Sequence, residues 1–259
     1  MRLDQALRVD ASRAARSWPL RLYLLLQVVA GVAFVVRRGE STISTVALIW
    51  LGMLVLAFTA WYAGRHRLAH PRPDPVPAAG ARTFFARVGV AGATLGGFGL
   101  AAGPGFVLVA CALAGWLWAA WRSGGLVGVA GRLSRDPRPF LPMLLLIGLP
   151  RLLVGGPAFV VGAVAALPSG IGQQLLFLPG LFAPLEAVSR RPAAAAVLAG
   201  LLFGLVHVPL VLDANDGDPL AAVANAVLFQ SSVGLIACLA YQRHRAAVPI
   251  GVAHALAIG

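Results

Sequence analysis

The sequence predicts an all-α fold, a polytopic transmembrane helix bundle of about eight spans, with seven to nine as the range. Two composition figures support this: 59% of the 259 residues are hydrophobic, and only 12% are charged. The mean hydropathy is +0.83. A soluble domain carries charge on about a quarter of its residues, and a disordered chain has low hydrophobicity. Long apolar runs that suit spans of about 20 residues complete the argument.

The charge distribution predicts the topology. The chain has 21 basic residues, every one an arginine, against nine acidic ones, which gives a formal net charge of +12. Nucleic-acid binding is excluded as an explanation because the apolar runs are too long for a soluble binder. With a cytoplasmic N-terminus, all arginines except Arg37, Arg38 and Arg151 fall in segments predicted inside. We therefore expect an integral protein of the inner or plasma membrane.

The N-terminal half is predicted to contain a basic interfacial segment followed by membrane helices. Residues 1–20 form the interfacial segment, and residues 21–138 carry helices separated by two basic loops. Proline is too frequent in the first loop for a helix, and the AAGPG stretch divides a run too long for one span. The expected spans are Leu22–Val36, Ile43–Ala63 and two helices within Phe84–Trp121, and the loops are Arg65–Arg82 and Arg122–Arg138.

Residues 139–259 are predicted to form the core helices. The stretch GLPRLLVGGP contains Arg151 and should interrupt a helix, so Phe140–Pro168 is interpreted as one broken passage. The remaining expected helices are Ile171–Val188, Pro192–Leu212, Pro219–Gln242 and a short one from Ala247 to the end. The acidic loop DANDGD, residues 213–218, is expected outside the membrane. Cys111 and Cys238 lie in apolar runs, which favours free thiols that pack as small hydrophobic side chains.

Polar side chains inside apolar helices are costly in lipid and tend to mark function. Gln27, Gln230, Ser231 and Ser232 are interpreted as interhelical hydrogen-bonding groups.

A second polar set consists of Gln173, Gln174, His207 and His254. His207 shares a helix face with Gly200 and Gly204, a face suited to close packing, so His207 should point into the bundle. A buried histidine is often only a hydrogen-bonded core residue, and the structural and functional interpretations are about equally supported.

The order of these residues resembles the CPBP family, the intramembrane endopeptidases that include the type II CAAX prenyl proteases and the bacteriocin-processing (ABI) proteins. That family's pattern is E-E-x-x-x-R on one helix, F-x-x-x-H on the next and H-x-x-x-N on the last. Phe203 and His207 match F-x-x-x-H, and His254 matches the last histidine. The resemblance covers about Pro168–Gly259 and implies that residues 139–259 form a CAAX-protease-like core.

The sequence departs from this pattern at the polar positions. Gln173 and Gln174 replace both glutamates, Leu178 stands at the arginine position, and Ile258 stands at the asparagine position. In the family a glutamate is thought to activate water. A neutral amide cannot accept that proton, and general-base catalysis contributes about 10²–10⁴ in rate. The resemblance thus assigns the candidate catalytic positions to His207, His254, Gln173 and Gln174, in neutralised form.

A resident metal or other cofactor is not expected. Glutamine is a poor zinc ligand, so two histidines and two glutamines do not make a convincing zinc site. His207 and His254 remain the only candidates for metal ligands in this set.

Other carboxylates have simpler explanations. Glu186 precedes Arg190 by four residues, the favoured order for a helical ion pair. Asp213, Asp216 and Asp218 fit a solvated external turn, because the glutamate expected at the twelfth position of a calcium loop is absent, Ala224 standing there.

Three functions are compatible with this sequence. The first is a family member with impaired or lost proteolysis and a binding or regulatory role. The second is an active intramembrane endopeptidase with a rearranged site built on His207 and His254, with an external aspartate as a candidate base. The third is a small permease. The expected partners are the lipid bilayer and a membrane-associated peptide or protein, and the oligomeric state is left open.

Overall fold

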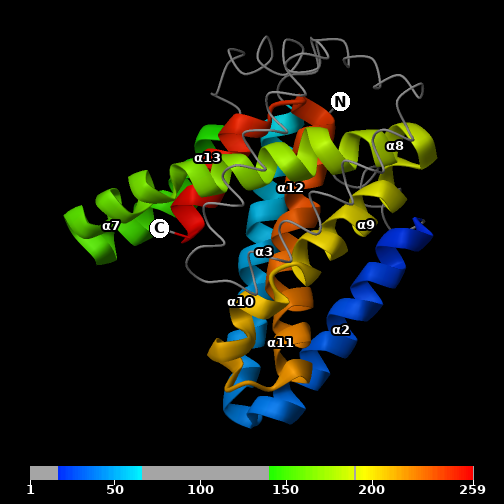
Figure 1. Cartoon of the computed structure of the whole chain (residues 1–259), viewed down its shortest axis with the longest axis vertical. Helices are drawn as coiled ribbons and strands as arrows, with labels where there is room; N and C mark the ends of the chain where they lie inside the picture. The colour runs from blue at the N-terminus through cyan, green and yellow to red at the C-terminus, as the bar shows by residue number, and fades with distance from the viewer. Residues whose placement is uncertain (1–16, 66–139, 190, 259) are drawn as a thin grey trace.

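The computed structural model describes residues 17–65, 140–189 and 191–258, and these residues form helices without any strand (Figure 1). The all-α prediction is confirmed for this part of the chain. The predicted interfacial segment, apart from its last residues, and the two spans expected within Phe84–Trp121 lie outside the described residues.

The first two described helices form a hairpin. Helix α2 covers Trp18–Arg38, and helix α3 covers Ile43–Arg65. The short turn η1, Glu40–Thr42, joins them after Gly39, whose φ of 90° is a conformation that favours glycine. Helix α2 extends the predicted span at both ends, and α3 begins at the predicted residue and ends two residues later than predicted, so the first two spans are confirmed as helices.

Helix α7, Leu141–Phe177, is interrupted at Gly156, where φ is 54° and ψ is −141°. The predicted interruption within GLPRLLVGGP is therefore confirmed. The predicted boundary before Ile171 is wrong, because α7 continues through Pro168, Ser169 and Gly170 and is followed by the π-turn η4, Leu178–Phe182, and helix α8, Ala183–Ser189. Gly170 serves helix packing rather than chain reversal, as shown below.

The predicted helix Pro192–Leu212 is divided in the structure. Helix α9, Pro192–Leu205, and helix α10, Val208–Leu212, meet at His207, and their axes, with α10 extended to Asn215, differ by 51°. Pro209 explains the break, because its nitrogen carries no hydrogen to donate to the carbonyl of Leu205 in a continuous helix.

The last helices follow the acidic turn. The turn η5 covers Asp213–Asn215, and the predicted helix Pro219–Gln242 is one passage composed of α11, Pro219–Asn225, the π-turn η6, Ala226–Gln230, and α12, Ser231–His244. The short terminal helix is α13, Ala247–Ile258. Figure 1 shows α2, α3, α11 and α12 running along the molecule, whereas α7 and α13 lie across one end of it.

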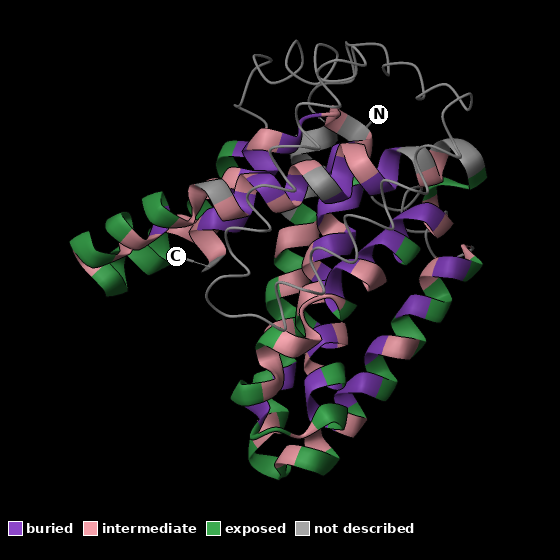
Figure 2. Ribbon diagram, viewed as in Figure 1, coloured by how far each residue is buried: buried purple, intermediate pink, exposed green. Residues whose placement is uncertain are grey.

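Four of these helical passages are long and apolar enough to cross a membrane: Trp18–Arg38, Glu40–Phe58, Leu141–Phe182 and Pro219–Gln242. The bent pair α9 and α10 would make a fifth. Exposed leucines and valines cover α2, α3 and α7, as Figure 2 shows by the exposed bands on these helices. Such surfaces suit contact with lipid, so the structure supports an integral membrane protein.

Glycines allow two helix pairs to approach until their backbones touch. A Cβ atom at Gly170 of α7 would lie 2.6 Å from the nitrogen of Ala255, and one at Gly251 of α13 would lie 2.6 Å from the Cα of Ile171. In the second pair, a Cβ atom at Gly200 of α9 would lie 2.8 Å from the nitrogen of Leu235 in α12. Small residues permit such contact where lipid supplies no hydrophobic driving force.

The contact between α7 and α13 predicts a stability difference between two glycines. Gly170→Ala should lower the free energy of unfolding by about 1–3 kcal/mol, because its methyl group overlaps backbone atoms that cannot move aside. Gly52→Ala in α3 is the matched control, since nothing lies within 4 Å of a Cβ atom there. Thermal unfolding of both variants in detergent tests this. Equal transition temperatures for the two variants would contradict the packing argument.

Candidate functional site

Phe203 is the centre of the candidate site. Its ring centroid lies 4.7 Å from that of His207 and 5.5 Å from that of His254. Phe177, at the end of α7, lies 4.9 Å away on an edge-to-face contact. Phe203 is itself only 1% exposed. The structure thus brings both predicted histidines against one buried aromatic ring, from positions 47 residues apart in the sequence.

His207 is positioned by the break between α9 and α10. Its Nδ1 lies 2.6 Å from the carbonyl oxygen of Phe203, four residues earlier. Because a carbonyl only accepts, Nδ1 carries the hydrogen in this arrangement, and the neutral ring presents Nε2 as an acceptor. The expectation that His207 points into the bundle is met: Gly204, one turn back, would place a Cβ atom 2.7 Å from the carbonyl oxygen of Ala226.

His254 and Gln174 are buried without hydrogen-bond partners in the described part of the chain. His254 is 6% exposed and Gln174 is 1% exposed. Neither ring nitrogen of His254 and neither amide atom of Gln174 has a partner. A buried polar group left unpaired costs about 1–3 kcal/mol, so these two side chains are poised to bond with a further polar group.

Gln173 is partly satisfied by its own helix. Its Nε2 donates to the Oγ of Ser169 at 3.0 Å, whereas its Oε1 is buried without a partner. Both glutamines lie one turn beyond Gly170, the residue that contacts α13 beside His254. No hydrogen bond within the described residues joins either glutamine to either histidine. The structure therefore places the glutamines on the helix that packs against the helix of His254.

The two remaining motif positions lie at element boundaries. Leu178 begins the π-turn η4 and is buried in the apolar core at 1% exposure. Ile258 is the last residue of α13. The position that the family gives to an arginine is thus surrounded by apolar side chains in this chain.

Comparison with protein families finds one match over this region. Residues 155–257 match the family described as type II CAAX prenyl endopeptidase Rce1-like. This matched segment, residues 155–257, is similar to Rce1-like proteins. The resemblance to the CAAX-protease-like family is thereby confirmed for this segment, which begins at the interruption of α7 and ends within α13. Searches of curated proteins and of solved structures gave no match.

Within the matched segment, Glu186 forms an ion pair with Arg245. The carboxylate accepts from Nε2 of Gln242 at 2.9 Å and from Arg245, and both side chains of the Glu186–Arg245 pair are largely buried. Arg190, the predicted partner, lies outside the described residues. Glu186 therefore fastens α8 to the end of α12 and is not available to the site.

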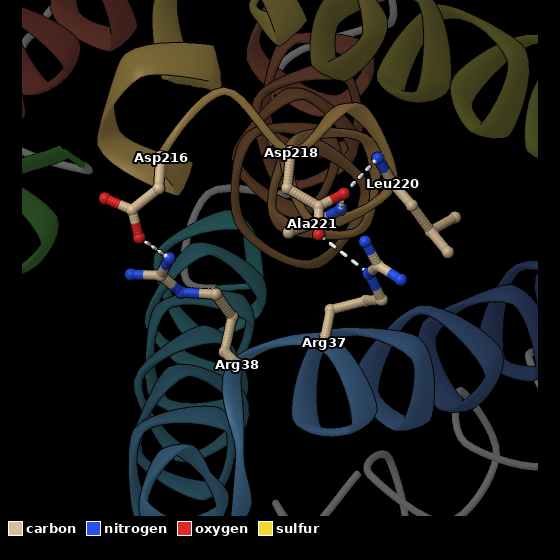
Figure 3. Close-up of polar contacts among 6 residues, drawn as sticks. All are labelled: Arg37, Arg38, Asp216, Asp218, Leu220 and Ala221. Atoms are coloured by element: carbon tan, nitrogen blue, oxygen red, sulfur yellow. Dashed lines mark hydrogen bonds and ion pairs between the residues drawn. The ribbon is translucent and has the colours of Figure 1, made fainter.

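Two aspartates of the matched segment, Asp216 and Asp218, pair with the two arginines that end α2. Arg37 donates from Nε to Asp218 at 2.7 Å, and Arg38 pairs with Asp216, as Figure 3 shows. Asp218 also caps α11 by accepting from the backbone nitrogens of Leu220 and Ala221, at 2.9 and 3.2 Å. Arg37 and Arg38 lie outside the segments predicted to be cytoplasmic. Each is thus paired with a carboxylate at the same end of the bundle.

A buried polar cluster holds α2 against η6 and the start of α12. The hydroxyl of Tyr23 lies 3.0 Å from that of Ser231 and 2.9 Å from that of Ser232. Nε2 of Gln27 donates to Tyr23 and to the carbonyl of Val227, at 2.7 and 2.6 Å. The predicted interhelical role is confirmed for Gln27, Ser231 and Ser232. Tyr23 was missed, although its position one turn before Gln27 was a usable signal.

The donor set of the site does not fit a zinc centre. Within the described residues, no three side chains of histidine, cysteine, aspartate or glutamate lie where they could hold one metal ion. Glutamine is a poor zinc ligand.

The Arg37–Asp218 contact predicts a pH dependence. Hydrogen bonding from Arg37 holds the pKa of Asp218 below its ordinary value. The resulting stabilisation is complete above the unfolded-state pKa of about 3.9 and is lost as the pH falls through the lowered folded-state pKa. The transition temperature of the Asp218→Asn variant should therefore fall less steeply with acidification below about pH 4 than that of the parent.

Asp213→Asn is the control, because Asp213 is an exposed neighbour that pairs with no arginine in the described residues. Its transition temperature, followed by circular dichroism, should show the parent's dependence on pH. If Asp218→Asn retained that dependence as well, the ion pair would not be stabilising.

Proposed function

We propose that this chain is an integral membrane protein of the Rce1-like family that binds a membrane-associated peptide or protein without cleaving it. The observation that carries the proposal is the pair Gln173 and Gln174 at the positions where the family pattern has two glutamates. Orientation with a cytoplasmic N-terminus, residence in the inner or plasma membrane and a total of about eight spans belong to the same proposal.

The chemistry of the site supports the loss of proteolysis. An amide cannot take a proton from water, and this removes a contribution of about 10²–10⁴ to the rate. Glu186 and Asp218 are poor substitutes, because each is already held in an ion pair with an arginine. Leu178 is consistent with this change, since an arginine there would be a buried charge without its glutamate partner, which is strongly destabilising.

The same site retains what binding requires. Gln174 offers an amide donor and an acceptor, and His254 offers the same pair of functions in its neutral form. A peptide bond presents the complementary N–H and C=O groups. Phe177 and Phe203 pack against each other as buried aromatic rings of the same core, so the surroundings of the site are apolar, as an apolar residue or a prenyl group next to the peptide would require.

A second function, an active endopeptidase with a rearranged site, has one specific observation in its favour. The hydrogen bond from Nδ1 of His207 to Phe203 leaves Nε2 as an acceptor that could take a proton from water. We rank it second because no carboxylate among the described residues orients this histidine. A permease has no comparable observation and stays a prediction of the sequence alone.

The experiment uses the full chain in nanodiscs. Its ligand is a fluorescent farnesylated peptide with a CAAX C-terminus, because the matching family is that of CAAX prenyl endopeptidases. We expect saturable binding and an intact peptide by mass spectrometry. Gln174→Leu and His254→Leu should each weaken binding by about 5–150-fold, since each removes a hydrogen-bonding group worth about 1–3 kcal/mol. Gln27→Leu, which removes another buried glutamine, should leave the affinity unchanged.

Two outcomes would contradict the proposal. Cleavage of the peptide that is abolished by His207→Ala would establish the endopeptidase instead. Equal affinity of the parent, Gln174→Leu and His254→Leu would place binding elsewhere.

A further inference from the structure

The tip of α7 projects an apolar surface from the body of the protein. Gly156 divides the helix into two arms, which extend beyond α13 at the left of Figure 1. Val154 beside the tip is 92% exposed, and Figure 2 shows exposed residues on both arms. The exposed apolar side chains of this surface are Leu149, Leu152, Leu153, Val154, Val160, Val161 and Val164.

Arg151 is the one charged side chain within α7, and it lies in the middle of this surface. Its Nη1 donates to the carbonyl oxygen of Leu256, in the last turn of α13, at 3.2 Å. This carbonyl accepts one of the five N–H groups of the guanidinium and does not neutralise its charge. Arg151 is therefore a cation with spare donors on a surface suited to lipid.

The described elements packed against α7 supply no acidic residue as a counter-ion for Arg151. Neither α7 nor α13 contains an aspartate or a glutamate. Glu186 pairs with Arg245, and the acidic turn pairs with Arg37 and Arg38. Arginine in a membrane passage is costly, and long basic side chains reach toward the phosphate layer to reduce this cost.

We propose that the tip of α7 binds an anionic phospholipid, with the headgroup phosphate at Arg151 and the acyl chains along the exposed leucines and valines. The planar guanidinium matches two phosphate oxygens at once. The apolar surface on both sides of Arg151 supplies the contact that a soluble anion could not use. A peptide carboxylate would satisfy the charge, but it would leave most of that surface uncovered.

This lipid would also act on the candidate site through α13. Leu256, which accepts from Arg151, lies two residues after His254. Gly148 on the first arm, at which a Cβ atom would lie 3.3 Å from Leu256, contacts the same turn. A phosphate that fixes Arg151 would thereby hold the last turn of α13 against α7. The lipid site does not depend on whether the domain cleaves or binds peptides.

The test is native mass spectrometry of the full chain with added phosphatidylglycerol or phosphatidylcholine. We expect the parent to retain phosphatidylglycerol preferentially, and Arg151→Gln to weaken that binding by about tenfold or more, because hydrogen bonds between charged groups are the strong ones. Arg151→Lys keeps the charge without the planar fork and should fall between them. Arg191→Gln, at an exposed arginine before α9, should bind like the parent.

The proposal is overturned if Arg151→Gln and Arg191→Gln retain phosphatidylglycerol equally. It is also overturned if inorganic phosphate, or a soluble peptide with a free carboxylate, displaces the lipid at matched concentration, because the site would then recognise the anion alone. If Arg151→Gln does not fold, the comparison is made with Arg151→Lys. Parent-like binding of phosphatidylglycerol by Arg151→Lys would overturn the proposal, because a positive charge alone would then be enough for binding.

Discussion

Backbone contact between glycine-bearing helices is the constraint on which the described structure depends. Gly170 and Gly251 bring α7 and α13 together, and Gly200, Gly204 and Gly234 do the same for α9 and α12. A bilayer offers no hydrophobic drive for helix association, so close packing must supply the attraction. The polar residues of the site stand within about a turn of these contacts. The packing that makes the fold possible is therefore also what gathers Gln174, Phe203 and His254.

Departures from regular helix surround the same place. The helix breaks at His207, the π-turn η4 follows the two glutamines, and the π-turn η6 lies against Gly204. Both η4 and η6 are short π-helices. Such π-helical segments are rare and are often found at functional sites. In η6 the carbonyl of Val227 also accepts from Gln27 of α2. Irregular backbone in a membrane protein persists where neighbouring side chains satisfy it, and here the neighbouring helix does so.

Much of this arrangement could be predicted, and the failures have physical causes. The orientation of His207 followed from Gly200 and Gly204, because a face of small residues is a local property of the sequence. The ion pair of Glu186 with Arg245 could not be predicted from the sequence, since Arg245 lies 59 positions away and only the fold brings the two residues together. The predicted boundary before Ile171 was wrong because a glycine such as Gly170 can either end a helix or pack against another helix. The sequence alone does not distinguish these two roles. The contacts of Arg37 and Arg38 with the acidic turn required the same long-range knowledge.

The placement of charge explains how the matched segment, residues 155–257, can keep a polar site in its interior. Three of its carboxylates, Glu186, Asp216 and Asp218, are each paired with an arginine near a helix end, where solvent or headgroups can share the charge. The site itself contains amides and imidazoles, which can be neutral, together with aromatic rings. Neutral donors and acceptors cost far less to bury than ions do. Under the proposed function, such a site recognises a peptide group through hydrogen bonds, because its described residues include no carboxylate that could activate water.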